Sequence, residues 1–413
     1  MINALLYIIL THPASAIPIR DGRSYLTAHG TQIAIISRDS AAGHLTRLSP
    51  RDASALCFPS SMNHARTAVR IAIVATSYPS HPLDPTGHFV RAESLALVEQ
   101  GHDVHIIAPA GPEGLLSNDE GLTSWPITHA GAFGWPGAMS RLREKPWRLF
   151  GAAAFAALAS DRLRRLRPTR IIAHWMIPCA IPIASFSRIT ERVDVVSHGA
   201  DVRFLLSLPA PVRERIVGNV LSLASSIRFA AHATYAALAH SLPAELQTRL
   251  HAKAVVALPT LNVPDVSLEA KRLRQQLGSS PLAVTVSRLV ASKRVDLAIA
   301  AARHVRPPFR LGVLGDGPER EKLSRLPGAE HAIFQGFLPR NQALAWIAAA
   351  DVLIHASTTE AAPTAIREAR QCRIPVVACD AGDVALWAQR DHGIVVVPPS
   401  PSAIASAVNQ LIA

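Results

Sequence analysis

The chain has 413 residues, of which 49% are apolar and 17% charged, and its formal net charge is +12. This length exceeds what one ordinary core supports, and the composition excludes a mainly disordered chain, so we expect two folded domains. The positive charge predicts an anionic partner, for which nucleic acid, anionic lipid and a phosphorylated substrate are the candidates.

The first 67 residues show little sustained hydrophobic periodicity. The opening run "MINALLYIILTHPASAIP" lacks the basic residues that precede the apolar core of a secretory signal, so a signal peptide is not favoured. Met62 stands just ahead of the first convincing buried strand. We interpret residues 1–67 as a poorly ordered extension or a mis-set start, with the working protein beginning near Met62. No apolar run approaches the length of a membrane span.

Short apolar runs then alternate with amphipathic segments. The runs at 69–76 and 102–109 predict strands, and the segment 88–101 between them predicts a helix that ends at Gly101. Strand, helix and strand within so short a stretch form a βαβ unit, which implies a parallel sheet. Further strands are expected at 170–177 and 192–200, separated by a helical segment at 181–188.

Prolines and polar residues at 258–280 predict the crossing between two domains, after which the alternation restarts. We therefore predict an α/β fold of two doubly wound, Rossmann-like domains, residues 68–262 and 263–413, that face each other across a cleft at the carboxyl ends of their strands. In the second domain we expect strands at 282–289, 309–317, 351–357 and 374–380, and helices at 294–305, 340–350 and 401–413.

Two cations follow the first strand of the second domain. Arg288 and Lys293 lie five positions apart in a strand-to-helix loop, where an arginine fork and a lysine point charge can converge on one anionic group. Two solvated loop cations are the alternative. Nearby, Gly315 and Gly317 flank Asp316 at a strand end, which permits close backbone approach to a ligand or a simple turn. Their spacing is not the G-x-G-x-x-G of nicotinamide dinucleotide binding.

The first domain offers two further candidates. Gly87 lies just ahead of a helix, where backbone N–H groups suit contact with an anion or an acceptor. His198, with Gly199 and Asp201, follows an apolar strand and so falls at the carboxyl edge of the sheet, where a histidine can meet a substrate hydroxyl. His174, in "AHWMIP", is the rival at a similar edge. The chain has 18 histidines, so a structural role competes for each.

The stretch "STTEAAPTAIREARQC" places Glu360 and Glu368 on either side of a loop-to-helix junction. Pro363 suits the first position of a helix running to about Cys372. The free N–H groups and the positive dipole end of that helix would hold a diphosphate. Carboxylates do not favourably touch a diphosphate, so the two acids are expected to bind neutral hydroxyls beside it. A nucleotide-sugar offers both kinds of group; a solvated helix with a charged first turn is the alternative.

Together these residues resemble the GT-B-fold retaining glycosyltransferases, specifically glycosyltransferase family 4, from about Val69 to the C-terminus. The resemblance implies that Glu360 binds hydroxyls of the transferred sugar and Glu368 the nucleotide ribose, that Arg288 and Lys293 bind the diphosphate, and that His198 lies near the reacting sugar. His198, Glu360, Arg288 and Lys293 are the implied catalytic residues. The rest of the implied donor site consists of Gly87, Gly315, Phe337 near the nucleobase, Ala361, Pro363 and Thr364.

The implied reaction moves a sugar from a UDP- or GDP-linked donor to a hydroxyl of a glycan or lipid-linked acceptor, with retention of configuration, in surface polysaccharide or glycolipid biosynthesis. Fixed cations and N–H groups would stabilise the leaving diphosphate. The chain has no D-x-D motif, so the resemblance implies a metal-independent reaction without a cofactor. The sequence does not identify the nucleobase, the sugar or the acceptor. It also does not indicate the oligomeric state.

Four positions depart from the pattern of the family. Ala361, Arg373, Ser287 and Arg294 stand where glycine is usual, and each adds backbone strain if its position needs a positive φ. The last helix also ends early, at Ala413. These departures favour the alternative of a catalytically weak or inactive nucleotide-sugar-binding protein. A GT-B nucleotide-sugar epimerase, which needs no acceptor, is a further alternative, and a dehydrogenase is disfavoured.

Residues 141–170 contain nine Lys/Arg and two Asp/Glu around an alanine-rich centre with Trp147. A basic amphipathic segment with an aromatic residue suits an anionic membrane surface, and a solvated surface helix is the alternative. Aromatic residues are only 5% of the chain and no nucleic-acid-binding motif occurs, so nucleic acid is not expected as a partner. We expect a cytoplasmic protein with reduced thiols, peripheral on the inner face of the plasma membrane.

Overall fold

The computed structural model describes four short strands between residues 17 and 47, and residues 68–412 apart from gaps at 82–83, 85, 112–114, 116–119, 135–136, 188–191 and 307–308. The chain divides into two compact units, Met1–Thr67 and Ala68–Ala413. In the first unit a four-stranded antiparallel sheet, which hydrophobic periodicity did not predict, joins β1 (Ile17–Pro18), β2 (Ser24–His29), β3 (Gln32–Ser37) and β4 (Thr46–Arg47) in chain order.

The predicted start near Met62 lies outside the described residues. It therefore stays a prediction, as does the interpretation of residues 1–67 as an extension.

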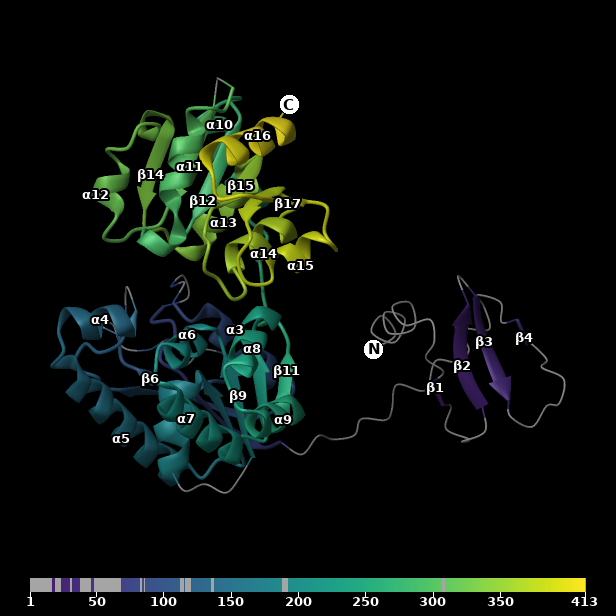
Figure 1. Cartoon of the computed structure of the whole chain (residues 1–413), viewed down its shortest axis with the longest axis vertical. Helices are drawn as coiled ribbons and strands as arrows, with labels where there is room; N and C mark the ends of the chain where they lie inside the picture. Colours follow the sequence, from purple (N-terminus) through teal and green to yellow (C-terminus); the bar gives the residue numbers. More distant parts are fainter. Residues whose placement is uncertain are drawn as a thin grey trace. The chain divides into compact units, whose positions relative to one another are not determined.

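A seven-stranded parallel sheet organises the first half of the second unit (Figure 1), with the order β11-β10-β9-β8-β5-β6-β7. The chain first adds β6 and β7 on one side of β5 and then adds β8 to β11 on the other side. The strand order therefore reverses between β5 and β8. The strands are β5 (Arg70–Val74), β6 (Asp103–Pro109), β7 (Thr123–Ile127), β8 (Arg170–His174), β9 (Arg192–Ser197), β10 (Ser226–Phe229) and β11 (Ala254–Val256).

Helices connect these strands. They are α3 (His88–Glu99), α4 (Ala138–Glu144), α5 (Arg148–Leu166), α6 (Ala200–Leu206), α7 (Ala210–Leu223), α8 (His232–His240) and α9 (Ala244–Lys253), with the π-helical segment η1 (Met176–Ala184) after β8. η1 begins earlier than the helix expected at 181–188, because the chain turns directly at the carboxyl end of β8.

The second half contains a six-stranded parallel sheet in the order β14-β13-β12-β15-β16-β17, which reverses between β12 and β15. Its strands are β12 (Leu282–Val286), β13 (Arg310–Leu314), β14 (Ala332–Gly336), β15 (Val352–His355), β16 (Val376–Cys379) and β17 (Ile394–Val397). Its helical segments are α10 (Ser267–Leu277), η2 (Ala291–Lys293), α11 (Val295–Ala302), α12 (Arg320–Leu323), η3 (Ala329–His331), α13 (Arg340–Ala349), α14 (Thr364–Gln371), α15 (Val384–Ala388) and α16 (Pro401–Leu411).

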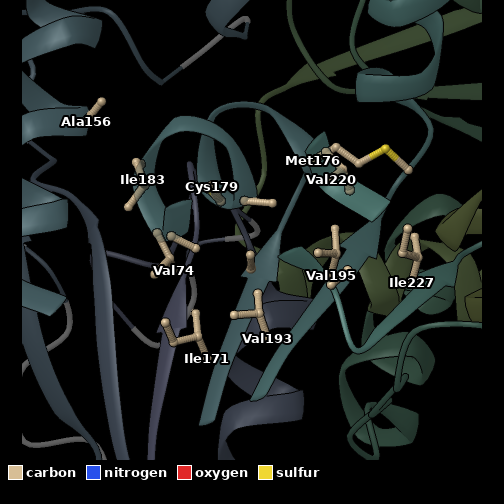
Figure 2. Packing of buried hydrophobic residues seen from close by; sticks show 14 of the residues in the cluster. Val74, Ala156, Ile171, Met176, Cys179, Ile183, Val193, Val195, Val220 and Ile227 are labelled. Atoms are coloured by element: carbon tan, nitrogen blue, oxygen red, sulfur yellow. The ribbon is translucent and has the colours of Figure 1, made fainter. Parts of the chain in front are cut away.

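Both faces of each sheet are buried, which explains the continuous apolar runs of the strands. On β5, Ile71 and Ile73 belong to one hydrophobic cluster, and the alternate residues Ala72 and Val74 belong to another on the opposite face. The second of these clusters also contains residues of β8, β9 and η1, part of which Figure 2 shows. The second sheet is built in the same way, between two clusters of its own.

The stretch predicted as a crossing between domains is partly helical. α10 occupies about half of it and packs against α13 of the second half, and Val266 is buried in a core cluster of that half. This helix was missed because prolines and charged residues mask a short apolar stripe. Within the described part of the chain no helix has the length and apolarity to cross a membrane, and Cys179, Cys372 and Cys379 are free thiols.

Candidate active site

The predicted cation loop lies at the carboxyl end of β12, where Arg288 follows the strand and Lys293 closes η2. Lys293 forms an ion pair with Glu360, and both side chains are largely buried. Burial lowers the pKa of Arg288 most, Glu360 opposes that shift, and the like charge of Arg203 lowers the pKa further. Arg288, Lys293 and Glu360 therefore form one electrostatic cluster, as their positions at neighbouring strand ends predict.

Glu360 has a second partner that the sequence analysis missed. His355, the last residue of β15, donates from Nε2 to the Glu360 carboxylate at 3.1 Å. Burial raises the pKa of Glu360, yet the hydrogen bond from His355 and the charge of Lys293 outweigh it and hold the pKa at about 2. Glu360 is thus a carboxylate at any physiological pH, and it can accept hydrogen bonds from hydroxyl groups. The position of His355 at a strand's carboxyl end was the available signal.

The second predicted acid, Glu368, lies in a different environment. It is buried in the middle of α14, where Arg340 donates to its Oε1 from Nη2 at 2.8 Å and from Nε at 3.2 Å. Burial raises the pKa of Glu368, and the charge of Arg340 opposes the rise. Arg340 was missed because it lies at the start of α13, far in sequence from the stretch that contains Glu360 and Glu368.

The helix after the loop begins one residue later than predicted. Pro363 has φ −63° and ψ 113°, so it precedes the first helical residue, Thr364, and α14 ends at Gln371. No described side chain caps this end of the helix. Anion binding by its first N–H groups stays a prediction.

Two predicted glycines owe their identity to close backbone packing. A Cβ at Gly315 would lie 1.9 Å from the carbonyl oxygen of Ser287, immediately before Arg288, so the glycine supports the cation loop. Gly87 has φ 68° and precedes α3, and a Cβ there would lie 2.5 Å from the carbonyl oxygen of Ser77. Phe337, just after β14, is 54% exposed.

Within the second unit, loops of the first sheet contact the Glu360 loop. Gly199 has φ 90°, and a Cβ there would lie 2.6 Å from the Cβ of Ala361. Asp383 accepts hydrogen bonds from the backbone N–H groups of His232 at 2.6 Å and Ala233 at 2.8 Å, at the start of α8. These contacts bring the His198–Gly199 loop of the first sheet beside Glu360 and Ala361 of the second.

The two candidate histidines of the first domain are hydrogen-bonded to each other. His174, at the end of β8, and His198, just after β9, form a hydrogen bond of 2.9 Å between Nδ1 and Nε2. Asp201, which the sequence analysis placed beside His198, shapes the loop. Its carboxylate accepts from the backbone N–H groups of Met176, Gly199 and Val202 and from the hydroxyl of Ser197.

Arg203 is a further cation that the sequence analysis missed. It lies in α6 near Arg288, whose pKa it lowers, and its Nη1 lies 3.6 Å from the position of a Cβ on Gly199. No carboxylate of the described residues pairs with Arg203. Together with Arg288 and Lys293 it leaves the cluster with more positive than negative charge, which suits a polyanionic ligand.

The four departures from the family pattern fall into two groups. Arg294 and Arg373 have positive φ values of 49° and 63°, so a side chain there carries the expected strain. Ser287 and Ala361 do not have positive φ, and their change from glycine adds no such strain. Among the described residues no group of three or more His, Cys, Asp or Glu side chains could hold a metal ion.

Comparisons with known proteins bear on the family and the fold. Residues 269–413 match the family described as "Glycosyl transferases group 1". Residues of this chain are 30% identical over 287 positions to a GDP-mannose-dependent alpha-(1-6)-phosphatidylinositol monomannoside mannosyltransferase of Mycolicibacterium smegmatis, covering 64% of this chain and 66% of that protein. The chain thus spans just under two thirds of the length of that relative.

A Bacillus subtilis protein named for teichuronic acid biosynthesis, the glycosyltransferase TuaC, is 25% identical over 83% of this chain and 89% of its own. Among solved structures, Anabaena HepE in complex with UDP and glucose superposes with a TM-score of 0.61 at 19% identity, covering 83% of this chain and 90% of that one. This likeness shows the two-domain GT-B fold. The candidate site residues between Ser287 and Glu368 lie within the matched region. Residues 269–413 therefore form a group 1 glycosyltransferase domain of GT-B type.

Proposed function

We propose that this protein is a retaining, metal-independent glycosyltransferase that moves a sugar from a nucleotide-sugar to a hydroxyl of a glycan or lipid-linked acceptor. The observation that carries the proposal is the cluster of Lys293, Glu360 and His355 beside Arg288. It combines cations for a diphosphate with an ionised carboxylate for sugar hydroxyls, at the strand ends of a group 1 glycosyltransferase domain.

The cations act on the leaving group. As the bond between the sugar and the diphosphate breaks, negative charge grows on the diphosphate, and Arg288, Lys293 and the N–H groups at the start of α14 stabilise it. They are held in place by the fold and need no reorganisation during the step, which lowers the barrier. In this proposal their fixed charge does the work that a divalent ion does in metal-dependent enzymes.

The acids and the histidine orient the sugar and the nucleotide. Glu360, held as a carboxylate by Lys293 and His355, binds hydroxyls of the transferred sugar. Glu368 binds the ribose, exchanging part of its interaction with Arg340 for ribose hydroxyls. His198, at the carboxyl edge of the first sheet, lies on the acceptor side and meets a substrate hydroxyl. The remaining proposed contacts are made by Gly87, Gly315, Phe337, Ala361, Pro363 and Thr364.

The names of the relatives support the substrate classes. The Mycolicibacterium relative is named for a GDP-mannose donor and a phosphatidylinositol mannoside, and Anabaena HepE was solved with UDP and glucose. Both donors are nucleotide-sugars, so the donor class is supported while the nucleobase stays open. The names phosphatidylinositol monomannoside and teichuronic acid support a lipid-linked or polymeric acceptor.

The test is a donor-binding and transfer panel. UDP- and GDP-sugars are titrated into wild type, Arg288→Ala and Glu368→Ala, with Arg310→Ala as the control, because Arg310 lies at the opposite, amino-terminal edge of the second sheet. We expect one donor to bind saturably, with weaker binding only in the first two variants and no effect of a chelator on transfer. Absence of binding by any donor to folded protein would overturn the proposal. Binding without release of nucleotide would favour the alternative of an inactive binding protein. Conversion of the donor in the absence of an acceptor would favour the alternative of an epimerase.

We further propose that α4 and α5 contact an anionic membrane surface on the cytoplasmic side. At their junction Trp147, Leu149 and Phe150 are 56%, 64% and 81% exposed, beside the exposed Arg143 and Lys145. Inward-facing residues of α5 such as Phe155 and Leu163 are fully buried, so the exposed apolar side chains are not needed for the core. Exposed aromatic residues next to basic ones suit the interface of an anionic bilayer.

Vesicle flotation tests this surface. Wild type is expected to float with vesicles that contain anionic lipid, and the double variant Leu149→Ser with Phe150→Ser to remain largely in solution. Leu386→Ser with Leu411→Ser, at exposed leucines of the second half, is the control and is expected to float normally. Equal flotation of wild type and the 149/150 variant would contradict the proposal.

A further inference from the structure

His174 is a buried histidine with one satisfied and one unsatisfied ring nitrogen. Its side chain is 0% exposed. Nδ1 shares the 2.9 Å hydrogen bond with Nε2 of His198, whereas Nε2 has no hydrogen-bond partner among the described residues. A buried polar atom without a partner is uncommon in a stable core and usually marks a functional constraint.

The ring of His174 is neutral. Burial, and after it the charge of Arg228, lower the pKa of His174 to about 3. A neutral imidazole carries one proton, on either Nδ1 or Nε2, and the neighbouring groups decide which. The direction of the hydrogen bond to His198 therefore depends on what faces Nε2.

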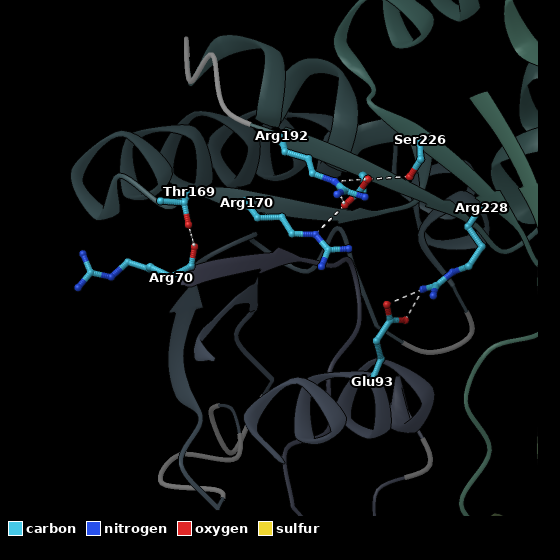
Figure 3. A network of polar contacts seen from close by, with 8 residues as sticks. Arg70, Glu93, Thr169, Arg170, Arg192, Ser226 and Arg228 are labelled. Atoms are coloured by element: carbon cyan, nitrogen blue, oxygen red, sulfur yellow. Dashed lines mark hydrogen bonds and ion pairs between the residues drawn. The ribbon is translucent and has the colours of Figure 1, made fainter. Parts of the chain in front are cut away.

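Glu93 faces that nitrogen. It projects from α3, and its Oε2 lies 3.9 Å from Nε2 of His174. Arg228, on β10, forms an ion pair with the same carboxylate (Figure 3), which holds the Glu93 side chain in place. A distance of 3.9 Å is too long for a hydrogen bond, but in a buried site an N–H directed at a carboxylate is favourable and a lone pair directed at it is not.

The proton of His174 therefore belongs on Nε2, and Nδ1 must accept. His198 then donates from Nε2, and its own Nδ1 carries a lone pair. No hydrogen bond to Nδ1 of His198 exists among the described residues, and the ring is half-buried, so this atom is open to a ligand. Phe89 and Trp175 pack on the ring with centroid distances of 4.6 and 4.9 Å and restrict its rotation.

We propose that Glu93 and His174 are positioning residues that hold His198 in the tautomer whose Nδ1 accepts a hydrogen bond from a substrate hydroxyl. The polar chain runs from Arg228 through Glu93 and His174 to His198 and links three neighbouring strands with α3. The ligand class is a neutral hydroxyl donor, and no proton transfer is required. The inference rests on the proposed function only in assigning that hydroxyl to a sugar substrate.

Nitrogen NMR of protein with ¹⁵N-labelled histidine tests the tautomer without any substrate. The resonances of His198 are identified as those lost in His198→Gln. We expect Nε2 of His198 to show the pyrrole-type shift and Nδ1 the pyridine-type shift in wild type. In His174→Phe, which keeps a buried aromatic ring but no acceptor, this preference should be lost. A pyridine-type Nε2 in wild type, or an unchanged His198 in folded His174→Phe, would overturn the proposal.

Transfer kinetics provide the second measurement. Loss of one hydrogen bond to substrate should lower kcat/KM about 10-fold in His174→Phe. His174→Asn should restore much of it, because the amide oxygen lies near the place of Nδ1 and can accept from His198. The control is His240→Phe, an exposed position on α8. A failure of all donors to bind would overturn the proposed function and leave the NMR result standing, so the two failures are distinguishable.

Discussion

The carboxyl edges of the two sheets use opposite kinds of chemistry. At the second sheet Lys293 and His355 contact Glu360, and both lower its pKa and so stabilise its ionised form. At the first sheet His174 and His198 form a neutral pair, because burial is the largest influence on both rings and lowers both pKa values. A charged edge suits a diphosphate and its sugar, and a neutral edge suits an uncharged substrate hydroxyl.

The charged edge should be the more sensitive to substitution. Replacing Lys293 with alanine removes a fixed cation from the proposed leaving group and leaves Glu360 with only His355. We expect transfer to fall about 10²–10³-fold, as for loss of one preorganised group that stabilises developing charge. Steady-state transfer with the donor identified by the panel measures this. Lys322→Ala, at an exposed position on α12, is the matched control, and an equal loss there would contradict the assignment.

Arg203 tests whether the first sheet contributes charge to the second. Removing the charge with Arg203→Gln should weaken nucleoside diphosphate binding about 5- to 10-fold, the effect of one charged hydrogen bond, and leave nucleoside binding unchanged. Calorimetric titration with the diphosphate and with the nucleoside separates the two. Arg215→Gln, on α7, serves as the control. If nucleoside binding falls by the same factor, Arg203 acts on the fold of the site and not on the diphosphate.

The two glutamates of the stretch 360–368 should respond to pH with opposite sign. The pKa of Glu360 is depressed to about 2, so its stabilising contribution is present above its ordinary pKa and is lost as the pH falls toward 2; it amounts to about 3 kcal/mol at most. Burial raises the pKa of Glu368, so its contribution is present at low pH and is lost as the pH rises through the raised value.

Denaturant unfolding of wild type, Glu360→Gln and Glu368→Gln at a series of acidic pH values measures both. The stability difference between wild type and Glu360→Gln should shrink as the pH falls. For Glu368→Gln the variant should gain relative to wild type as the pH rises. Parallel stability curves for all three proteins would show that neither carboxylate has a shifted pKa.

The smallest expected effect concerns the strained arginines. Arg373→Gly should raise stability by about 0.5–1 kcal/mol, since glycine adopts a positive φ without the steric cost of a side chain. Arg303→Gly, at a position with φ −66°, is the control and should not stabilise. Thermal unfolding detects the difference as a higher Tm for the first variant alone. A Tm equal to or below that of wild type for Arg373→Gly would contradict the strain at this position.

Several features could be predicted because they depend on local pattern. The runs that became β5, β6, β12 and β16 are mainly apolar, as is typical of strands buried on both faces, so their place in parallel sheets could be predicted from sequence alone. The same pattern placed Arg288, Lys293, Glu360 and His198 at carboxyl ends of strands. Short strands such as β10 and the helix α10 were missed, because their apolar residues are too few to show a period.

The partners of these residues depended on the tertiary structure. Local sequence patterns were enough to predict two parallel α/β halves with acids and cations at their strand ends, since periodicity and loop position are local properties. Only the fold decided that His355 and Lys293 share Glu360, that Arg340 pairs with Glu368, and that His174 and His198 are partners. Such pairings arise from strand order and helix packing, which bring together residues far apart in sequence and set the burial that shifts their pKa values.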